Sequence, residues 1–83
     1  MEEVVVVRVG KRGLREEVIR EIDNVLRARG VVKVKLLKNF REAHGVDREA
    51  RAAIASELAK RLNAVVVEVR GYTVTLRRPR WRR

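Results

Sequence analysis

The spacing of the apolar residues constrains this chain most, because it switches between the repeat of a strand and the repeat of a helix. Residues 3–9 are mostly β-branched and predict a strand. Residues 14–29 carry apolar side chains at spacings of three and four, which predicts a helix, and Gly30 follows where a helix-ending glycine is favoured. The predicted buried face of this helix consists of Leu14, Val18, Ile22, Val25 and Leu26. Residues 31–37 then alternate between apolar and basic side chains and predict a second strand.

The middle of the chain predicts a loop and a second helix. Residues 38–46 are polar and indicate a loop. Asp47 can cap a helix over residues 47–62, whose apolar side chains again recur at spacings of three and four. The predicted buried face of this helix consists of Ala50, Ile54, Ala55, Leu58 and Leu62.

The end of the chain predicts a hairpin. Residues 65–69 and 72–76 alternate on either side of Arg70-Gly71, and Pro79 ends the last strand. The resulting order is βαβαββ. We therefore expect the α/β (α+β) class: a single domain with a four-stranded mixed sheet and two helices on one face.

Strand parity predicts which side chains lie on the sheet face opposite the helices, called the open face below. Lys33 and Lys35 point to this face, because the apolar residues between them point to the helices. The full predicted set is strongly basic and consists of Arg8, Lys33, Lys35, Glu68, Arg70, Thr73, Thr75 and Arg77, with Val4, Val6 and Val66 beside them.

The length and residue types exclude several classes of protein. The 83 residues fit one domain, predicted over residues 1–78 with a basic tail over 79–83. There is no cysteine, which excludes disulfides and thiolate metal sites. No apolar run approaches the roughly 20 residues of a membrane span, and the N-terminus lacks the plan of a signal peptide. We expect a cytoplasmic protein without a membrane, metal or cofactor requirement. Its 39% charged residues are typical of a thermophile.

The net charge of +10 favours a polyanionic partner, and nucleic acid comes first. The excess is concentrated in two places. Residues 77–83 hold five arginines and no acid, and residues 30–46 contribute +3, from four cations against Glu42. Those four cations are Lys33, Lys35, Lys38 and Arg41. Helix 14–29, by contrast, sums to zero.

Gly10-Lys11-Arg12-Gly13 is the most informative local motif. It lies between a predicted strand and a predicted helix, whose free N–H groups attract phosphate. KH domains use a GXXG loop to clamp a nucleic-acid backbone. The alternative is an ordinary turn with solvent-exposed basic residues. The basic pair between the glycines and the net charge favour the phosphate-binding interpretation.

The other basic residues have weaker interpretations. Lys33 and Lys35 can contact phosphates or 2′-hydroxyls, or can simply keep the strand soluble. The segment 77–83, which includes Arg78 and Trp81, can add electrostatic affinity and stacking, or can be a disordered segment. His44, the one histidine, is expected to be a solvated loop residue. No arrangement of residues predicts an enzyme.

Several of these segments together resemble the CRM domain, a family named for chloroplast RNA splicing and ribosome maturation, whose single-domain bacterial members are the YhbY proteins. The segment Val9–Leu14 contains the family's GxxG loop, and residues 18–23 resemble its first helix. Residues 31–37 look like its "IKVKVL" strand, and residues 57–59, 65–69 and 71–76 resemble its last helix and closing hairpin. The resemblance covers about residues 4–78.

The resemblance implies a fold similar to the C-terminal domain of bacterial translation initiation factor three. It also implies an RNA-binding protein, with ribosomal RNA or its precursor as partner, acting in large-subunit assembly or RNA maturation. The implied RNA contacts are the loop, Gly10 to Gly13, and the strand residues Lys33 and Lys35. Further expected contacts are Lys38, Arg70, Arg77 and Arg78. We expect a monomer that can associate with ribosomal particles.

The chain departs from the family pattern at the hairpin and before the second helix. Tyr72 stands where the family has Lys or Arg, and Arg77 stands where it has Tyr. The segment 38–46 is longer than usual. These departures leave the hairpin contacts less defined than the loop.

Other interpretations remain open. An Alba-type protein is also small, basic and of βαβαββ order, but it dimerises and coats DNA or RNA. A permanent structural ribosomal protein is a second alternative. An RNA-processing nuclease is the third, and it would have to depend on His44.

Overall fold

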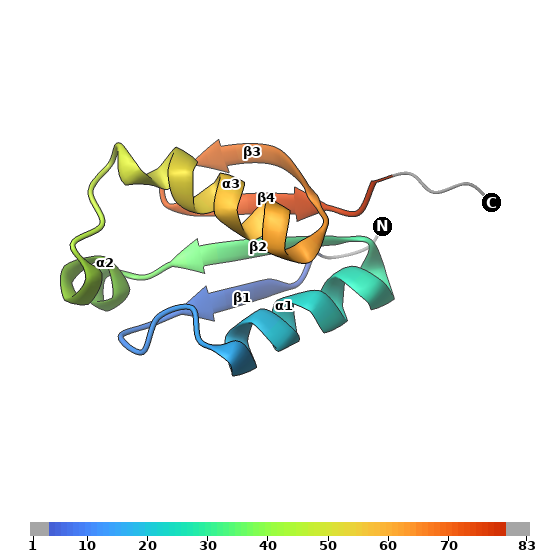
Figure 1. Cartoon of the computed structure of the whole chain (residues 1–83), viewed down its shortest axis with the longest axis horizontal. Helices are drawn as coiled ribbons and strands as arrows, with labels where there is room; N and C mark the ends of the chain where they lie inside the picture. The colour runs from blue at the N-terminus through green and yellow to red at the C-terminus, as the bar shows by residue number, and fades with distance from the viewer. Residues whose placement is uncertain (1–3, 80–83) are drawn as a thin grey trace.

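The alternating segments and the terminal hairpin form one four-stranded sheet in the computed structural model, which describes residues 4–79 (Figure 1). The strands are β1 (Val6–Val9), β2 (Val31–Leu36), β3 (Val65–Arg70) and β4 (Thr73–Arg77), and the helices are α1 (Glu16–Arg29), α2 (Lys38–His44) and α3 (Ala50–Leu62). The spatial order is β1-β2-β4-β3. β1 and β2 are parallel, and the other neighbouring strands are antiparallel. The predicted mixed sheet and fold class are confirmed.

The core lies between the sheet and the two long helices, α1 and α3, which lie together in front of the sheet in Figure 1. Its central side chains are Ile22, Leu26, Val32, Val34, Leu36, Leu58, Val74 and Leu76, all nearly inaccessible to solvent. Each large aliphatic side chain buried in this way contributes about 1.5–3 kcal/mol. The buried face of α1 also includes Ile19, which was not in the predicted set, whereas Leu14, Val18 and Val25 are only partly buried. The alternation of β2 is confirmed, because Lys33 and Lys35 are exposed.

The segment predicted to be a loop, residues 38–46, instead contains the helix α2. Phe40 anchors this helix, with only 4% of its surface exposed. The helix ends at Gly45, whose φ of +62° is left-handed and whose N–H donates to the Arg41 carbonyl. One buried aromatic residue in seven positions produces no repeat along the sequence. The helix was therefore missed because its stability comes from packing against the core.

The helix predicted over 47–62 begins later, at Ala50. Asp47 nevertheless caps the turn before it, since its Oδ1 accepts a hydrogen bond from the Ala50 N–H at 2.9 Å. At the other end, Asn63 adopts the left-handed conformation expected of a residue that ends a helix. None of the helices within the described residues is both long and apolar enough to cross a membrane.

A bulge changes the faces of β3. The register shifts between Val66 and Glu68, so Val67 is an extra residue in the strand. As a result Val66 packs against the core, whereas Val65 is exposed and pairs with Arg77. The prediction that Val66 shares the open face is wrong, because strand parity holds only where no residue is inserted.

Arg78 joins the two long helices. Its guanidinium donates to the Asp23 carboxylate of α1 at 3.2 Å and to the carbonyl of Leu62, the last residue of α3, at 3.0 Å. Asp23 also accepts from Arg27 at 3.0 Å, the pair that their spacing of four residues predicted. The side chains of Arg78 and Asp23 are 23% and 28% exposed, so this contact is better shielded from solvent than the Arg27 contact.

Asp23→Ala is expected to lower the free energy of unfolding by about 1–2 kcal/mol, because it leaves the half-buried Arg78 guanidinium without its carboxylate. Arg27→Ala is the matched control, and it should cost no more than about 0.5 kcal/mol because Arg27 is largely exposed. Chemical denaturation of both variants measures the difference. Equal losses of unfolding free energy in the two variants would show that the Asp23–Arg78 contact contributes nothing beyond the Asp23–Arg27 pair.

Candidate nucleic-acid interface

The Gly10–Gly13 segment forms a tight turn between β1 and α1. The Gly13 N–H donates to the Gly10 carbonyl at 2.9 Å, and Lys11 and Arg12 are exposed at the tip. α1 begins only at Glu16, and its first turn carries Glu16 and Glu17. These two carboxylates already complement the helix dipole. The helix terminus therefore offers no uncompensated positive end, and the exposed positive charge of this turn comes from Lys11 and Arg12.

His44 holds this turn from the side. Its Nε2 lies 3.0 Å from the Lys11 carbonyl oxygen, and because a carbonyl only accepts, the ring nitrogen must donate. The ring also lies over Gly13, where a Cβ would come within 2.8 Å of Nε2. Phe40 supports the ring from within α2, with the ring centroids 5.0 Å apart. His44 was predicted to be a solvated loop residue. It is exposed, as predicted, but it lies at the end of α2 and its ring supports the turn.

The sequence offered no signal for this contact. His44 and Lys11 are 33 positions apart, and α2 itself was not predicted. Gly13 itself is buried and has a φ of +83°, a left-handed conformation that favours glycine.

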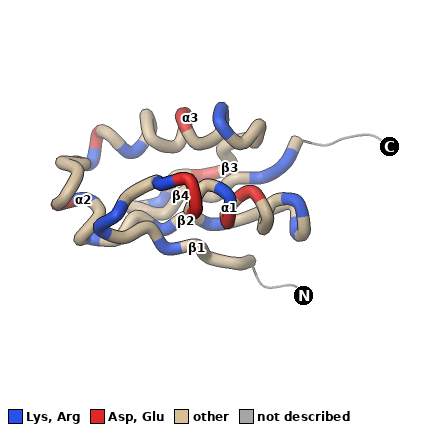
Figure 2. The backbone as a smooth tube through the Cα atoms, turned by 60° about the horizontal axis from the view of Figure 1, so that its bottom comes forward, with Lys and Arg blue, Asp and Glu red and all other residues tan. Residues whose placement is uncertain are grey.

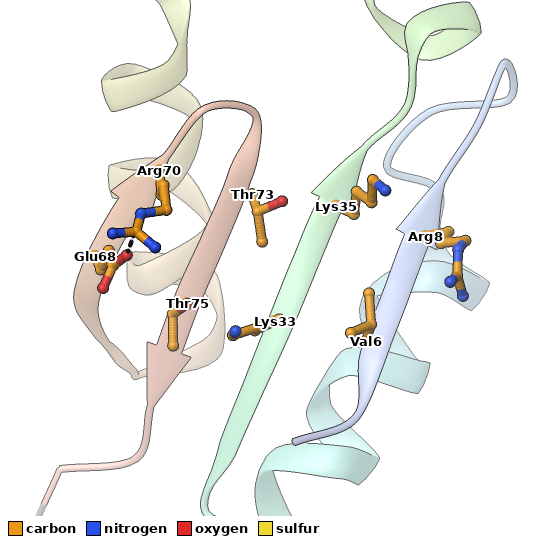
Figure 3. Close-up of a pocket in the computed structure, with 8 residues that line it drawn as sticks. All are labelled: Val6, Arg8, Lys33, Lys35, Glu68, Arg70, Thr73 and Thr75. Carbon is orange, nitrogen blue, oxygen red and sulfur yellow. Dashed lines mark ion pairs between the residues drawn. The ribbon is translucent and has the colours of Figure 1, made fainter. Parts of the chain in front are cut away.

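The open face carries the predicted basic side chains around a shallow depression (Figure 3). The lining residues are Val6, Arg8, Lys33, Lys35, Glu68, Arg70, Thr73 and Thr75. Arg70 pairs with Glu68 at 3.4 Å, so its charge is partly offset. Three further cations, Arg8, Lys33 and Lys35, come from the adjacent strands β1 and β2 and form no ion pair with an acid of residues 4–79. The four cations less Glu68 leave the depression with a formal charge of +3.

Acidic residues are nearly excluded from the sheet. Among the described residues, Glu68 is the one acid on a strand, while the others lie on the helices or in the segment before α3 (Figure 2). The helices interleave both signs, as α1 does. The fold therefore separates a mixed-charge helical side from a basic open face, which suits a polyanion better than a small neutral ligand.

The remaining predicted contact residues fall into two groups. Lys38 is exposed at the start of α2, and Arg77 is exposed at the end of β4, on the parity of the open face. Arg78 is not part of this surface, because it is bound to Asp23 and Leu62 on the helical side. Trp81 and the arginines after Pro79 lie outside the described residues. Within residues 4–79, no group of three or more His, Asp or Glu side chains is placed to hold a metal ion.

Comparisons with known proteins find a family profile and named relatives that match most of the chain. Residues 2–78 match the sequence profile of the CRS1 / YhbY (CRM) domain. The protein named "Probable RNA-binding protein MJ0652" of Methanocaldococcus jannaschii is 45% identical over 75 residues, which cover 90% of this chain and 52% of that protein. A protein of Haemophilus influenzae named "RNA-binding protein" is 34% identical over 74 residues, covering 89% of this chain and 68% of that protein.

A solved structure has the same architecture. The solution structure of SAV1595 from Staphylococcus aureus matches with a TM-score of 0.70 at 25% sequence identity, covering 92% of this chain and 72% of that one. The chain spans about half the length of the Methanocaldococcus protein, so the similarity concerns about half of that relative.

Proposed function

Because this chain belongs to the CRS1 / YhbY (CRM) domain family, we propose that it binds structured RNA through the Gly10–Gly13 turn and the open face. The names of the two relatives support RNA as the ligand. The observation that carries the proposal is the charge separation: Lys11, Arg12 and the cations of β1 and β2 have no carboxylate partner among the described residues.

The chemistry of the open face favours recognition of the RNA backbone. The residues lining the depression include no aromatic side chain on which a base could stack, unlike the RNA-binding sheets that carry exposed aromatics. Lysine ammonium groups and the hydroxyls of Thr73 and Thr75 are suited to phosphates and 2′-hydroxyls. The protein would thus recognise shape and backbone rather than base sequence.

The specific role we propose is large-subunit ribosome assembly, by a monomer acting in the cytoplasm. Its support is the resemblance to the single-domain family members that associate with large-subunit ribosomal precursors. The family assignment argues against the Alba-type alternative. That alternative predicts that the protein binds duplex DNA as tightly as RNA.

The proposal is tested by changing both Lys11 and Arg12 to Ala. Binding to large-subunit ribosomal RNA fragments and to matched duplex DNA is measured across a salt series. We expect RNA to be preferred, and the double variant to lose at least about tenfold in affinity, with a salt slope shallower by about two. Arg20→Ala with Arg29→Ala removes the same charge from the exposed side of α1 and serves as the control. Unchanged RNA affinity in the Lys11 and Arg12 variant would reject the turn as an RNA contact.

A further inference from the structure

A second group of cations surrounds Tyr72, the residue just before β4. Arg41 of α2 lies over the Tyr72 ring, with its Cζ 3.9 Å from the ring centroid, and Arg51 of α3 lies at 5.9 Å. Both distances are within the range of cation–π attraction. Tyr72 stands where the CRM family carries Lys or Arg. In this chain the positive charge near the hairpin therefore comes from Arg41 of α2 and Arg51 of α3.

Backbone carbonyls fix both guanidiniums. Arg41 donates through Nε to the Leu36 carbonyl at 3.3 Å. Arg51 donates through Nη1 to the Gly71 carbonyl at 2.6 Å and through Nε to the Arg48 carbonyl at 2.8 Å. A guanidinium has five N–H donors, so each arginine keeps donors free for another ligand. Such fixed side chains lose little conformational entropy when they bind.

Neither guanidinium is neutralised by an acid of residues 4–79. Among the described residues, no carboxylate forms an ion pair with Arg41 or Arg51. The arginines that do form ion pairs are Arg15, Arg27, Arg61, Arg70 and Arg78. A fixed, uncompensated and partly exposed guanidinium is suited to a phosphate, which it can bind with two parallel hydrogen bonds.

α2 connects this group to the Gly10–Gly13 turn. His44 supports the turn, and Arg41, three residues earlier on α2, stacks on the hairpin. Figure 1 shows the turn, α2 and the β3–β4 connection at the same end of the sheet. Two sets of cations, at the turn and around Tyr72, therefore lie near α2 at the same end of the sheet.

We propose that Arg41 and Arg51, stacked on Tyr72, form a second phosphate contact for the RNA backbone, at the same end of the sheet as the Gly10–Gly13 turn. This inference rests on the proposed function and extends it. The bound RNA passes over the end of the sheet at α2, and it is held at two separate points. Two fixed contacts define the line along which the RNA strand runs, which a single contact cannot do.

The first test changes both arginines to glutamine. Arg41→Gln with Arg51→Gln should weaken binding to a short RNA hairpin by about tenfold and make the salt slope shallower by about two. Arg20→Gln with Arg29→Gln removes the same net charge from α1 and should change affinity by less than about twofold. Arg41→Lys with Arg51→Lys keeps the charge but loses the planar fork, so it should restore only part of the affinity. Thermal unfolding of each variant establishes that it is folded at the temperature of the binding measurement.

A second measurement avoids substitution altogether. The Nε–H resonances of Arg41 and Arg51 are followed by NMR while the wild-type protein is titrated with the same RNA hairpin, together with the backbone amides of Gly10 to Gly13. We expect both sets to shift at the same RNA concentration. If the turn amides shift and the arginine resonances do not, this inference fails and the proposed function stands. If the wild-type protein does not bind RNA, the proposed function fails and the inference fails with it.

Discussion

Gly13→Ala is expected to lower the free energy of unfolding by about 2–3 kcal/mol. The left-handed backbone, with φ of +83°, costs an alanine roughly 1–2 kcal/mol. The new Cβ would lie 2.8 Å from the His44 Nε2, so the ring must move and lose its hydrogen bond to the Lys11 carbonyl, at a further cost of about 1 kcal/mol. In a domain of this size the loss corresponds to a fall in Tm of about 10–20 °C, measured by thermal unfolding.

Gly30→Ala separates the two causes. Gly30 has the same φ of +83°, but a Cβ there would meet nothing within 4 Å. It should therefore show only the backbone cost of roughly 1–2 kcal/mol. In a Gly13→Ala, His44→Ala double variant the steric conflict is removed, so the combined loss should be smaller than the sum of the single losses. If the Gly13 and Gly30 variants lose equal stability, His44 does not constrain the turn.

The largest effect on RNA binding is expected from Lys33→Glu combined with Lys35→Glu. The pair changes the formal charge of the depression from +3 to −1, because each substitution removes two units of charge. Placing carboxylates where phosphates approach costs several kcal/mol, and a loss of about 2.8 kcal/mol is a hundredfold in affinity. We therefore expect RNA affinity to fall by roughly a hundredfold, measured by equilibrium titration at low salt.

The fold should tolerate this change. Lys33 and Lys35 are exposed, and a Glu at position 35 would face Arg8 across the parallel pair of strands. Unfolding free energies should stay within about 0.5 kcal/mol of the wild type. Arg20→Glu with Arg29→Glu changes the net charge by the same amount on α1. If this control loses as much affinity as the sheet variant, binding depends on total charge, and the open face is not the interface.

Much of the architecture followed from local patterns. The alternation in residues 31–37 and the helical spacing in residues 14–29 depend on side-chain direction within one element, which the neighbouring residues determine. Both elements form as predicted, apart from their ends. The sequence likewise predicted the basic turn between two glycines, the family and the excess of positive charge.

Contacts between distant segments could not be predicted in this way. α2 depends on the burial of Phe40, and the support of the turn depends on His44 reaching a residue 33 positions away. Arg78 was predicted to belong to a basic C-terminal segment that contacts RNA. It binds the helical side of the sheet instead, because the Asp23 carboxylate and the last carbonyl of α3 lie close together there.

The sequence by itself thus determined the strands, the long helices and the sign of the surface charge. The tertiary structure determined which side chains of these elements face each other and which face solvent. It changed the faces of β3 through the bulge at Val67, placed His44 against the turn, and stacked Arg41 on Tyr72. The physical reason is that periodicity is a property of neighbouring residues, whereas packing, inserted residues and partners for charge depend on which segments the fold brings together.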